Sequence, residues 1–272
     1  MSGPRSTFHP AKWLGIMFAA CIVVLLAMPL FALAVSTTPS QMLEATAHPM
    51  FAPALWMSLK TTSLSLLAIV VMGTPLAWWL ATSKQRLARG VALLVELPVV
   101  VPPAVIGVAL LMTFGRQGLL GGLLTEMGIS VVFTTTAVIM AQVVVASPFY
   151  IKAATSAFAE VDPEFLIVAR SLGATPAQAI ARVALPMAWP GLFAGASVAW
   201  ARALGEFGAT LLFAGNMTGR TQTMPLAIFG ALEVDVQLAV VFSLILVALG
   251  ALILGALQYV ANLTSRDRAR LP

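Results

Sequence analysis

Six long apolar segments dominate the sequence, and their length constrains the fold more than any other feature. A helix rises about 1.5 Å per residue, so about 20 apolar residues cross a hydrocarbon core about 30 Å thick. The segments are 13–35, 59–81, 91–113, 131–151, 190–214 and 238–262. They lack the strict apolar–polar alternation of membrane β-strands. The sequence therefore predicts an all-α, polytopic membrane protein with six transmembrane helices.

The composition agrees with this class of protein. Hydrophobic residues make up 60% of the 272 residues and charged residues only 9%, whereas soluble domains carry about 25% charged residues. The net charge of +5 does not indicate nucleic-acid binding, because the basic residues are scattered over short loops. One cysteine, Cys21, and two separated histidines, His9 and His48, leave no basis for a disulfide or a metal site.

Lysine and arginine predict the orientation in an inner (plasma) membrane, because positive charge concentrates on the cytoplasmic side. One side holds eleven of them, the other side three, and Arg202 lies within a span. The eleven are Arg5, Lys12, Lys84, Arg86, Arg89, Lys152, Arg170, Arg182, Arg266, Arg268 and Arg270, and the three are Lys60, Arg116 and Arg220. Both termini are therefore predicted to be cytoplasmic.

The first apolar segment has a second interpretation. Arg5, Lys12, the apolar run and "ALA" at 32–34 also fit a cleaved signal peptide. The run exceeds the 7–15 residues of a usual signal core, so we expect a retained span. Charge counting does not separate the two, because Ala45 lies outside the cell in both.

The long cytoplasmic loop, 152–189, predicts two short helices. Asp162 is a good N-cap and Pro163 suits the first helical position, while Gly173 ends this first helix. Thr175 and Pro176 begin a second helix in the same way. The pair Leu185-Pro186 predicts the end of that helix and a turn toward the membrane. The apolar residues of the loop, which fit either a protein partner or the lipid headgroups, are Phe165, Leu166, Ile167 and Leu172.

The third segment contains Pro98, Pro102 and Pro103. Each proline removes a backbone donor and clashes with the carbonyl four residues back. The freed carbonyls need partners in a neighbouring helix or a water-filled cavity. We therefore expect this segment to face protein or a transport pathway, or to be a kinked packing helix.

The fifth segment contains Arg202 and Glu206, which lie four residues apart and so share one helix face. An unpaired charge at the bilayer centre costs at least about 2.5–3.5 kcal/mol, and pairing lowers that cost. Gly205, Gly208 and Ala209 beside them allow close helix packing. Two interpretations remain open: an internal ion pair that fixes packing, or a gate or pathway wall for an anion.

The spacing from Gly173 through nine residues to Val183-x-Leu185-Pro186 resembles the coupling motif of ABC importer permeases. That family places E-A-A three residues before the glycine, where this chain has "IVA" at 167–169, so one polar contact to the ATPase is absent. The resemblance implies that a cytoplasmic ABC ATPase docks on 171–181. The implied coupling residues are Ser171, Leu172, Gly173, Ala174, Thr175, Pro176, Leu185 and Pro186.

Three further stretches carry the same resemblance, which covers about 55–262. They are "SLKTTSLSLLAIVVMGTPLAWWLA", "LPVVVPPAVIG" and "ARALGEFGATLLFAGNMTGRTQTMPLAIF". The last resembles oxyanion permeases, and "GEFGA" with "GRTQTMPLAI" is most similar to molybdate permeases, since sulfate permeases tend to show GEYGS. The resemblance implies a pathway or gate formed by Pro102, Pro103, Arg202, Glu206 and Phe207.

The resemblance implies a type I ABC importer transmembrane domain at 55–262. It is preceded by 1–54, with the first span, and followed by a tail at 263–272. Two copies, an ATPase dimer and an external oxyanion-binding protein would import molybdate, with sulfate or tungstate as the alternative. The chain has no G-x-x-x-x-G-K-[ST], HExxH or nucleophile elbow, so we expect no enzyme activity, and ATP and magnesium on the ATPase. A stand-alone secondary transporter is a weaker alternative, because no inverted repeat is visible.

Overall fold

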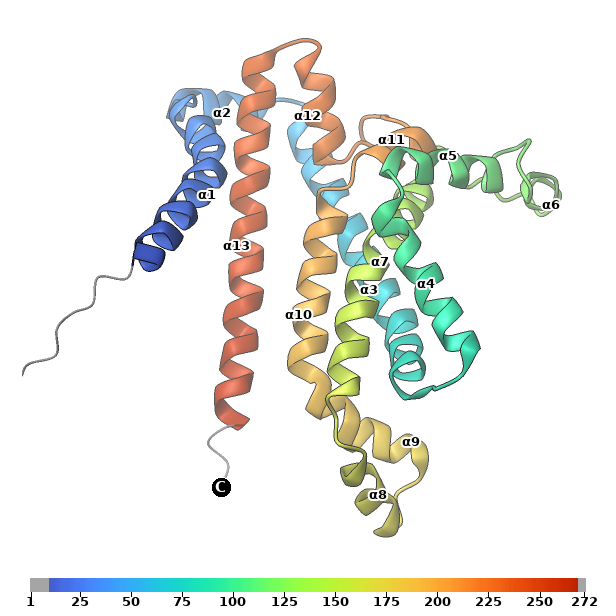
Figure 1. Cartoon of the computed structure of the whole chain (residues 1–272). Helices are drawn as coiled ribbons and strands as arrows, with labels where there is room; N and C mark the ends of the chain where they lie inside the picture. The colour runs from blue at the N-terminus through green and yellow to red at the C-terminus, as the bar shows by residue number, and fades with distance from the viewer. Residues whose placement is uncertain (1–9, 269–272) are drawn as a thin grey trace, which may run out of the picture.

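A computed structural model describes residues 10–268, and within that range the chain forms helices and no strand (Figure 1). Five helices are long and apolar enough to cross a membrane, and one bent pair makes a sixth crossing if it counts as one span. The predicted all-α membrane class is confirmed. The elements are α1 Pro10–Val35, α2 Pro39–Ala47, α3 Phe51–Thr82, α4 Arg86–Val100, α5 Pro103–Phe114, α6 Gly121–Glu126, α7 Thr135–Ala159, α8 Pro163–Ser171, α9 Pro176–Ala179, the π-helix η1 Ile180–Ala184, α10 Leu185–Leu204, α11 Gly208–Ala214, α12 Met224–Leu232 and α13 Val236–Arg268.

Helices α3, α7 and α10 form the centre of the bundle, as Figure 1 shows. Small residues allow their backbones to approach closely. A side chain added at Gly191 of α10 would place its Cβ 2.5 Å from the Cβ of Ala157 on α7, and one at Gly195 would lie 2.7 Å from that of Ala153. These two glycines are one turn apart, so they form a continuous groove into which α7 packs.

The buried face of α3 is polar at the end where this helix begins. Ser58, Thr61, Thr62 and Ser65 are all buried. Ser65 Oγ donates to Gln142 Oε1 of α7 at 2.9 Å, and Ser58 Oγ accepts from the backbone N–H of Met224 at 2.7 Å. Because lipid offers no hydrogen-bond partners, such pairing between helices lets polar side chains remain in a membrane bundle.

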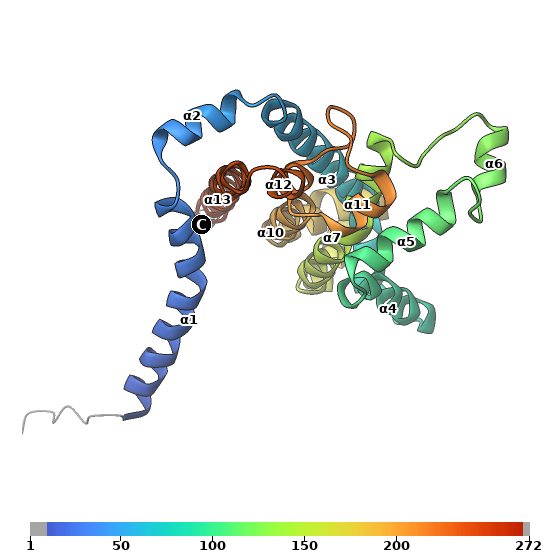
Figure 2. The same cartoon turned by 90° about the horizontal axis from the view of Figure 1, so that it is seen from above.

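Helix α1 lies at the edge of the molecule. Figure 2 shows it apart from the central bundle, and its described side chains are mostly exposed and apolar. Gln237 Nε2 of α13 donates to the carbonyl of Ser36 at 3.0 Å and ties the end of α1 to the bundle. An apolar helix with exposed sides fits a lipid environment.

The third segment is interrupted at its prolines, and the bend is sharper than that of the kinked helix considered from the sequence. Helices α4 and α5 are bent by 115° at a break that includes Pro102. Pro103 occupies the first turn of α5, where its missing N–H is tolerated, whereas Pro98 lies inside α4. Figure 1 shows α5 running across the bundle rather than along it. Two adjacent prolines thus redirect the chain instead of kinking it.

The fifth segment is also broken, which the sequence reading did not predict. Helix α10 ends at Leu204 and α11 begins at Gly208. The long loop is shorter than 152–189, because α7 continues to Ala159 and α10 begins at Leu185. The expected helix end at Leu185-Pro186 was wrong: η1 joins α9 to α10 without a turn, and Pro186 lies in the first turn of α10. The short helices α2, α6 and α12 were not predicted.

The close backbone contact between α5 and α11 gives a stability prediction. A Cβ at Gly107 of α5 would lie 2.9 Å from both the Cα and the carbonyl oxygen of Ala209 on α11. We expect Gly107→Ala to destabilise the protein by about 1–3 kcal/mol, the usual effect of overpacking. The control is Gly90→Ala in α4, where nothing lies within 4 Å and alanine favours the helix. Thermal unfolding of both purified variants tests this, and equal melting temperatures would contradict the α5–α11 contact.

Candidate functional site

The third and fifth apolar segments, which are both broken, meet where α5 and α11 begin. The site for a Cβ on Gly208, the first residue of α11, lies 3.2 Å from the backbone nitrogen of Ala104 and 3.4 Å from Pro103 Cβ. The expected pathway residue Pro103 thus lies against Gly208, the residue that follows Phe207, and Pro102 is the N-cap of α5. Phe207 also contacts Phe229 of α12, with ring centroids 5.2 Å apart. Sequence spacing alone did not indicate this meeting of α5 and α11.

Arg202 and Glu206 form an ion pair across the break between α10 and α11. Arg202 Nη1 lies 2.8 Å from Glu206 Oε2, and the other carboxylate oxygen, Oε1, accepts the backbone N–H of Ala209 at 2.9 Å. The Glu206 side chain is 1% exposed and that of Arg202 is 27% exposed. The predicted pairing is present, but the two residues do not share one continuous helix face.

The position of each charge explains why the break is tolerated. Arg202 lies in the last turn of α10, where the helix dipole favours a cation. Glu206 precedes α11, where free N–H groups favour an anion, and it satisfies one of them directly. The pair therefore neutralises itself and stabilises two helix ends. This geometry favours a structural role for Glu206 and leaves only part of Arg202 accessible.

The loop after α11 is held by its own polar side chains. Thr221 Oγ1 donates to the carbonyl of Gly215 at 3.1 Å and accepts the N–H of Met217 at 3.1 Å. Gln222 Nε2 donates to Asn216 Oδ1 at 2.9 Å. Polar side chains of the stretch "AGNMTGRTQT" therefore hold the connection between α11 and α12 in place. In the sequence this stretch was recognised only by its resemblance to known permeases, and these hydrogen bonds were not predicted.

The predicted helical turn of the long loop is confirmed. Asp162 Oδ1 accepts the N–H of Glu164 at 2.9 Å and caps α8, while Thr175 and Gln178 form a capping box at α9. Gly173 has φ +92°, a left-handed conformation that side chains with a Cβ rarely adopt. Figure 1 shows α8 and α9 projecting beyond the central helices.

The projecting turn exposes apolar side chains. Leu172 is 84% exposed, and Phe165, Ile167 and Val168 are also exposed on α8. Leu166 instead packs against the core that includes Phe158. An exposed apolar cluster at the tip of a projecting element is typical of a protein-binding surface.

The eight expected coupling residues do not form one surface. Six of them occupy the turn from the end of α8 to the start of α9. The other two, Leu185 and Pro186, lie in the first turn of α10, where the Leu185 side chain packs against the core. Those two connect the turn to the membrane helix rather than extend its surface.

A second charge pair lies outside the expected set. Lys152 Nζ of α7 is 3.1 Å from Glu96 Oε1 of α4, and both residues are within helices. The sequence prediction placed Lys152 in the loop 152–189, which was wrong, because α7 continues to Ala159. The feature of the sequence that could have indicated this pair is Glu96, a glutamate within the third apolar segment.

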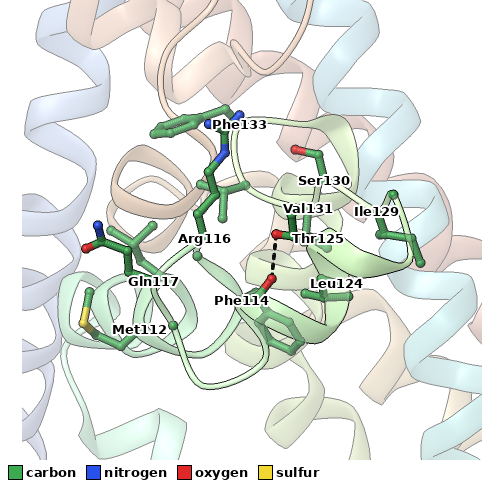
Figure 3. Close-up of a pocket in the computed structure, with 16 residues that line it drawn as sticks. Met112, Phe114, Arg116, Gln117, Leu124, Thr125, Ile129, Ser130, Val131 and Phe133 are labelled. Carbon is green, nitrogen blue, oxygen red and sulfur yellow. Dashed lines mark hydrogen bonds between the residues drawn. The ribbon is translucent and has the colours of Figure 1, made fainter.

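A cavity of about 870 Å³ lies between α5, α6 and the segment before α7 (Figure 3). Arg116 is its one charged side chain, and Phe133 lies near it in the close-up. Thr125 Oγ1 donates to the carbonyl of Gly121 at 2.7 Å and holds α6 together. The cavity is on the side of the molecule away from α8 and α9.

Comparison with known proteins places the chain. Residues 73–263 match the family described as "Binding-protein-dependent transport system inner membrane component". The chain belongs to this family. The molybdenum transport system permease protein ModB of Mycobacterium tuberculosis is 42% identical over 231 residues, which cover 85% of this chain and 88% of that protein. ModB of Escherichia coli K12 is 36% identical over 184 residues, 66% of this chain and 79% of that protein.

Solved structures agree with this family. A bacterial ABC transporter involved in alginate import matches with a TM-score of 0.75 at 16% identity, covering 93% of this chain and 96% of that one. The inward-facing methionine ABC transporter MetNI matches with a TM-score of 0.63 at 21% identity, covering 79% and 96%. These likenesses show the fold, and they confirm the predicted fold of an ABC importer permease. The family match begins within α3, so α1 and α2 precede it.

The geometry of the Arg202–Glu206 ion pair predicts how much each substitution in it destabilises the protein. Arg202→Leu leaves a buried carboxylate without its cation, which costs about 3–5 kcal/mol, and Glu206→Leu leaves the partly exposed Arg202 unpaired. Replacing both residues by leucine should recover much of the yield of folded protein, with a remaining deficit of about 1 kcal/mol from the lost cap on Ala209.

The matched control is Arg202→Leu with Glu206→Gln, which removes both charges and keeps an acceptor for Ala209. We expect this variant to be the most stable of the four, and uptake assays on it measure any direct role of Arg202 in transport. Equal yields from the single and double variants would show that the two residues are not coupled.

Proposed function

We propose that this chain is the permease subunit of an ATP-driven importer that carries molybdate into the cytoplasm. The observation that carries the proposal is the 42% identity to a molybdenum transport permease over 85% of the chain. A permease from an archaeon, Haloferax volcanii, named as a probable molybdenum ABC transporter permease, is 34% identical over 90% of the chain. Relatives with this name in bacteria and archaea support a shared substrate.

The proposed assembly contains two copies of this chain, a cytoplasmic ATPase dimer and an external oxyanion-binding protein. The exposed apolar turn from α8 to α9 supports ATPase docking. A solved relative of the same fold is a bacterial alginate ABC transporter in complex with its alginate pentasaccharide-bound periplasmic protein. ATP and magnesium would bind to the ATPase, because the permease has no phosphate-binding loop.

Coupling would pass through α10. Its first turn continues from η1 and the docking turn, and its last turn carries Arg202. Its 20 residues span about 30 Å as one rod, so a displacement of the docking turn reaches the break at Gly205. The break adjoins the start of α5, where the second broken helix changes direction. Closure of the ATPases would therefore shift α11 against α5 and open or close the pathway there.

Transport with a coupling variant tests this proposal. We expect proteoliposomes with the permease, its ATPase and its binding protein to take up molybdate only with ATP. Gly173→Val should insert normally and lower uptake at least about tenfold, because a β-branched residue resists φ +92°. Gly173→Asn should retain most uptake, because asparagine tolerates a left-handed backbone.

Competition by sulfate and tungstate in the same assay identifies the preferred oxyanion. Uptake without ATP would contradict an ABC importer, and full uptake with Gly173→Val would contradict docking at this turn.

Reporter fusions test the proposed orientation, with both termini in the cytoplasm. Thr175 and Arg220 lie toward opposite ends of the bundle in Figure 1, in the α8–α9 turn and the α11–α12 loop. The positive-inside rule places the first in the cytoplasm and the second outside. A phosphatase fused after Arg220 should be active and one after Thr175 inactive. The reverse pattern would invert the orientation, and activity at both positions would contradict the six-span topology.

A further inference from the structure

A cavity of about 200 Å³ between α3, α4 and α7 contains charges that neither the coupling turn nor the central ion pair explains. It opens beside the connection from α3 to α4, two turns before the end of α7. Its walls are partly apolar, from residues such as Leu80 and Val95. Its charged and hydroxyl-bearing lining residues are Arg89, Glu96, Lys152, Ser83, Thr155 and Ser156.

The charges of this cavity do not cancel. Lys152 Nζ is 3.1 Å from Glu96 Oε1, with side chains that are 73% and 50% exposed. Arg89 forms no ion pair with any of the residues 10–268 described here, so two cations share the cavity with one carboxylate. An unmatched arginine beside hydroxyl donors is the chemistry that recognises the oxygens of phosphate-like anions.

The two charged cavity residues of α4, Arg89 and Glu96, lie at different positions along that helix. Arg89 lies in the first turn of α4, and Glu96 is seven residues further on, about 10 Å along the same face. Charges exposed at this depth are costly in hydrocarbon, so the cavity must face water, a lipid headgroup or an anion. The exposed pair also differs from Arg202 and Glu206, because neither Glu96 nor Lys152 is held by a helix end or a buried acceptor.

We propose that this cavity binds a tetrahedral oxyanion group, with Arg89 and Lys152 as its cationic ligands. The hydroxyl of Ser83 supplies a further donor at its wall, whereas Thr155 Oγ1 already donates to the carbonyl of Ile151 at 2.7 Å. In the empty site Glu96 pairs with Lys152, and an incoming anion competes with Glu96 for that ammonium group. The volume accommodates one anion of five heavy atoms with a few waters, at roughly 30 Å³ per water.

Two sources supply this chemistry. One is the phosphate of an anionic phospholipid, whose acyl chain would lie along the apolar wall of α4. The other is the transported oxyanion on its way out of the pathway, and this source rests on the proposed function. Both require the same two cations, so the probes must tell them apart.

The test uses the full-length chain in lipid nanodiscs. One arm measures equilibrium binding of radiolabelled molybdate in phosphatidylcholine nanodiscs. The second arm measures retained phosphatidylglycerol by native mass spectrometry after reconstitution in mixed phosphatidylcholine and phosphatidylglycerol. Saturable binding in the first arm identifies the transported oxyanion and in the second a lipid, and either result supports the site.

Four variants test the site in whichever arm shows binding: two should weaken binding, one should tighten it, and one is a control. Arg89→Gln and Lys152→Gln should each weaken binding about fivefold, the effect of one exposed charge-assisted hydrogen bond. Glu96→Gln should tighten binding about threefold, because the competing carboxylate is gone. The matched control is Arg86→Gln, which removes the same charge three residues before Arg89 and does not line the cavity.

Three results would overturn the proposal. They are equal weakening by Arg86→Gln and Arg89→Gln, weaker binding with Glu96→Gln, and saturable binding of neither probe. Lys152→Arg, which keeps the charge, distinguishes loss of binding from loss of folding, since it should bind nearly normally. A permease that fails to transport molybdate yet retains phosphatidylglycerol would refute the proposed function alone. Normal molybdate transport with identical binding by all variants would refute this site alone.

Discussion

The requirement that every backbone group in a membrane finds a partner governs the centre of this structure. A helix that stops within the bilayer leaves carbonyls at one end and N–H groups at the other, with no water to receive them. The chain stops α10 at Leu204 and places Arg202 in its last turn and Glu206 before the next helix. The carboxylate accepts from Ala209 N–H with one oxygen and contacts the guanidinium with the other. One ion pair thus permits a helix break that would otherwise leave more backbone groups without partners and destabilise the fold.

The break has a structural consequence because a second break lies against it. The prolines at 102 and 103 turn the chain into α5, and small residues let α5 and α11 touch through Gly107, Gly208 and Ala209. The continuous rod of α10 links this contact to the α8–α9 turn through η1. Single π-helical turns within α-helices occur frequently at functional sites.

Sequence reasoning found the features that local chemistry encodes. Apolar length located the spans at α1, α3 and α13, and capping residues located α8 and α9 because Asp162 and Thr175 act on their own neighbours. Contacts between helices that are distant in the sequence were harder to predict from the sequence. The apolar run around Gly205 reads as one span by hydropathy, since the break depends on packing against α5. Glu96 and Lys152 are 56 residues apart, and only the contact of α4 with α7 brings them together.

The two charge pairs found among residues 10–268 show why pairing alone does not define a role. Glu206 is 1% exposed and both its oxygens have partners, so releasing Arg202 would leave a buried carboxylate unpaired. Glu96 is half exposed and Lys152 is more so, which means that water can replace either partner, and another anion can replace Glu96, at little cost. An ion that passes through a membrane protein needs contacts that form and break easily. The exposed pair has that property and the buried pair does not, which favours an architectural role for Arg202 and Glu206 and leaves Glu96 and Lys152 able to exchange partners.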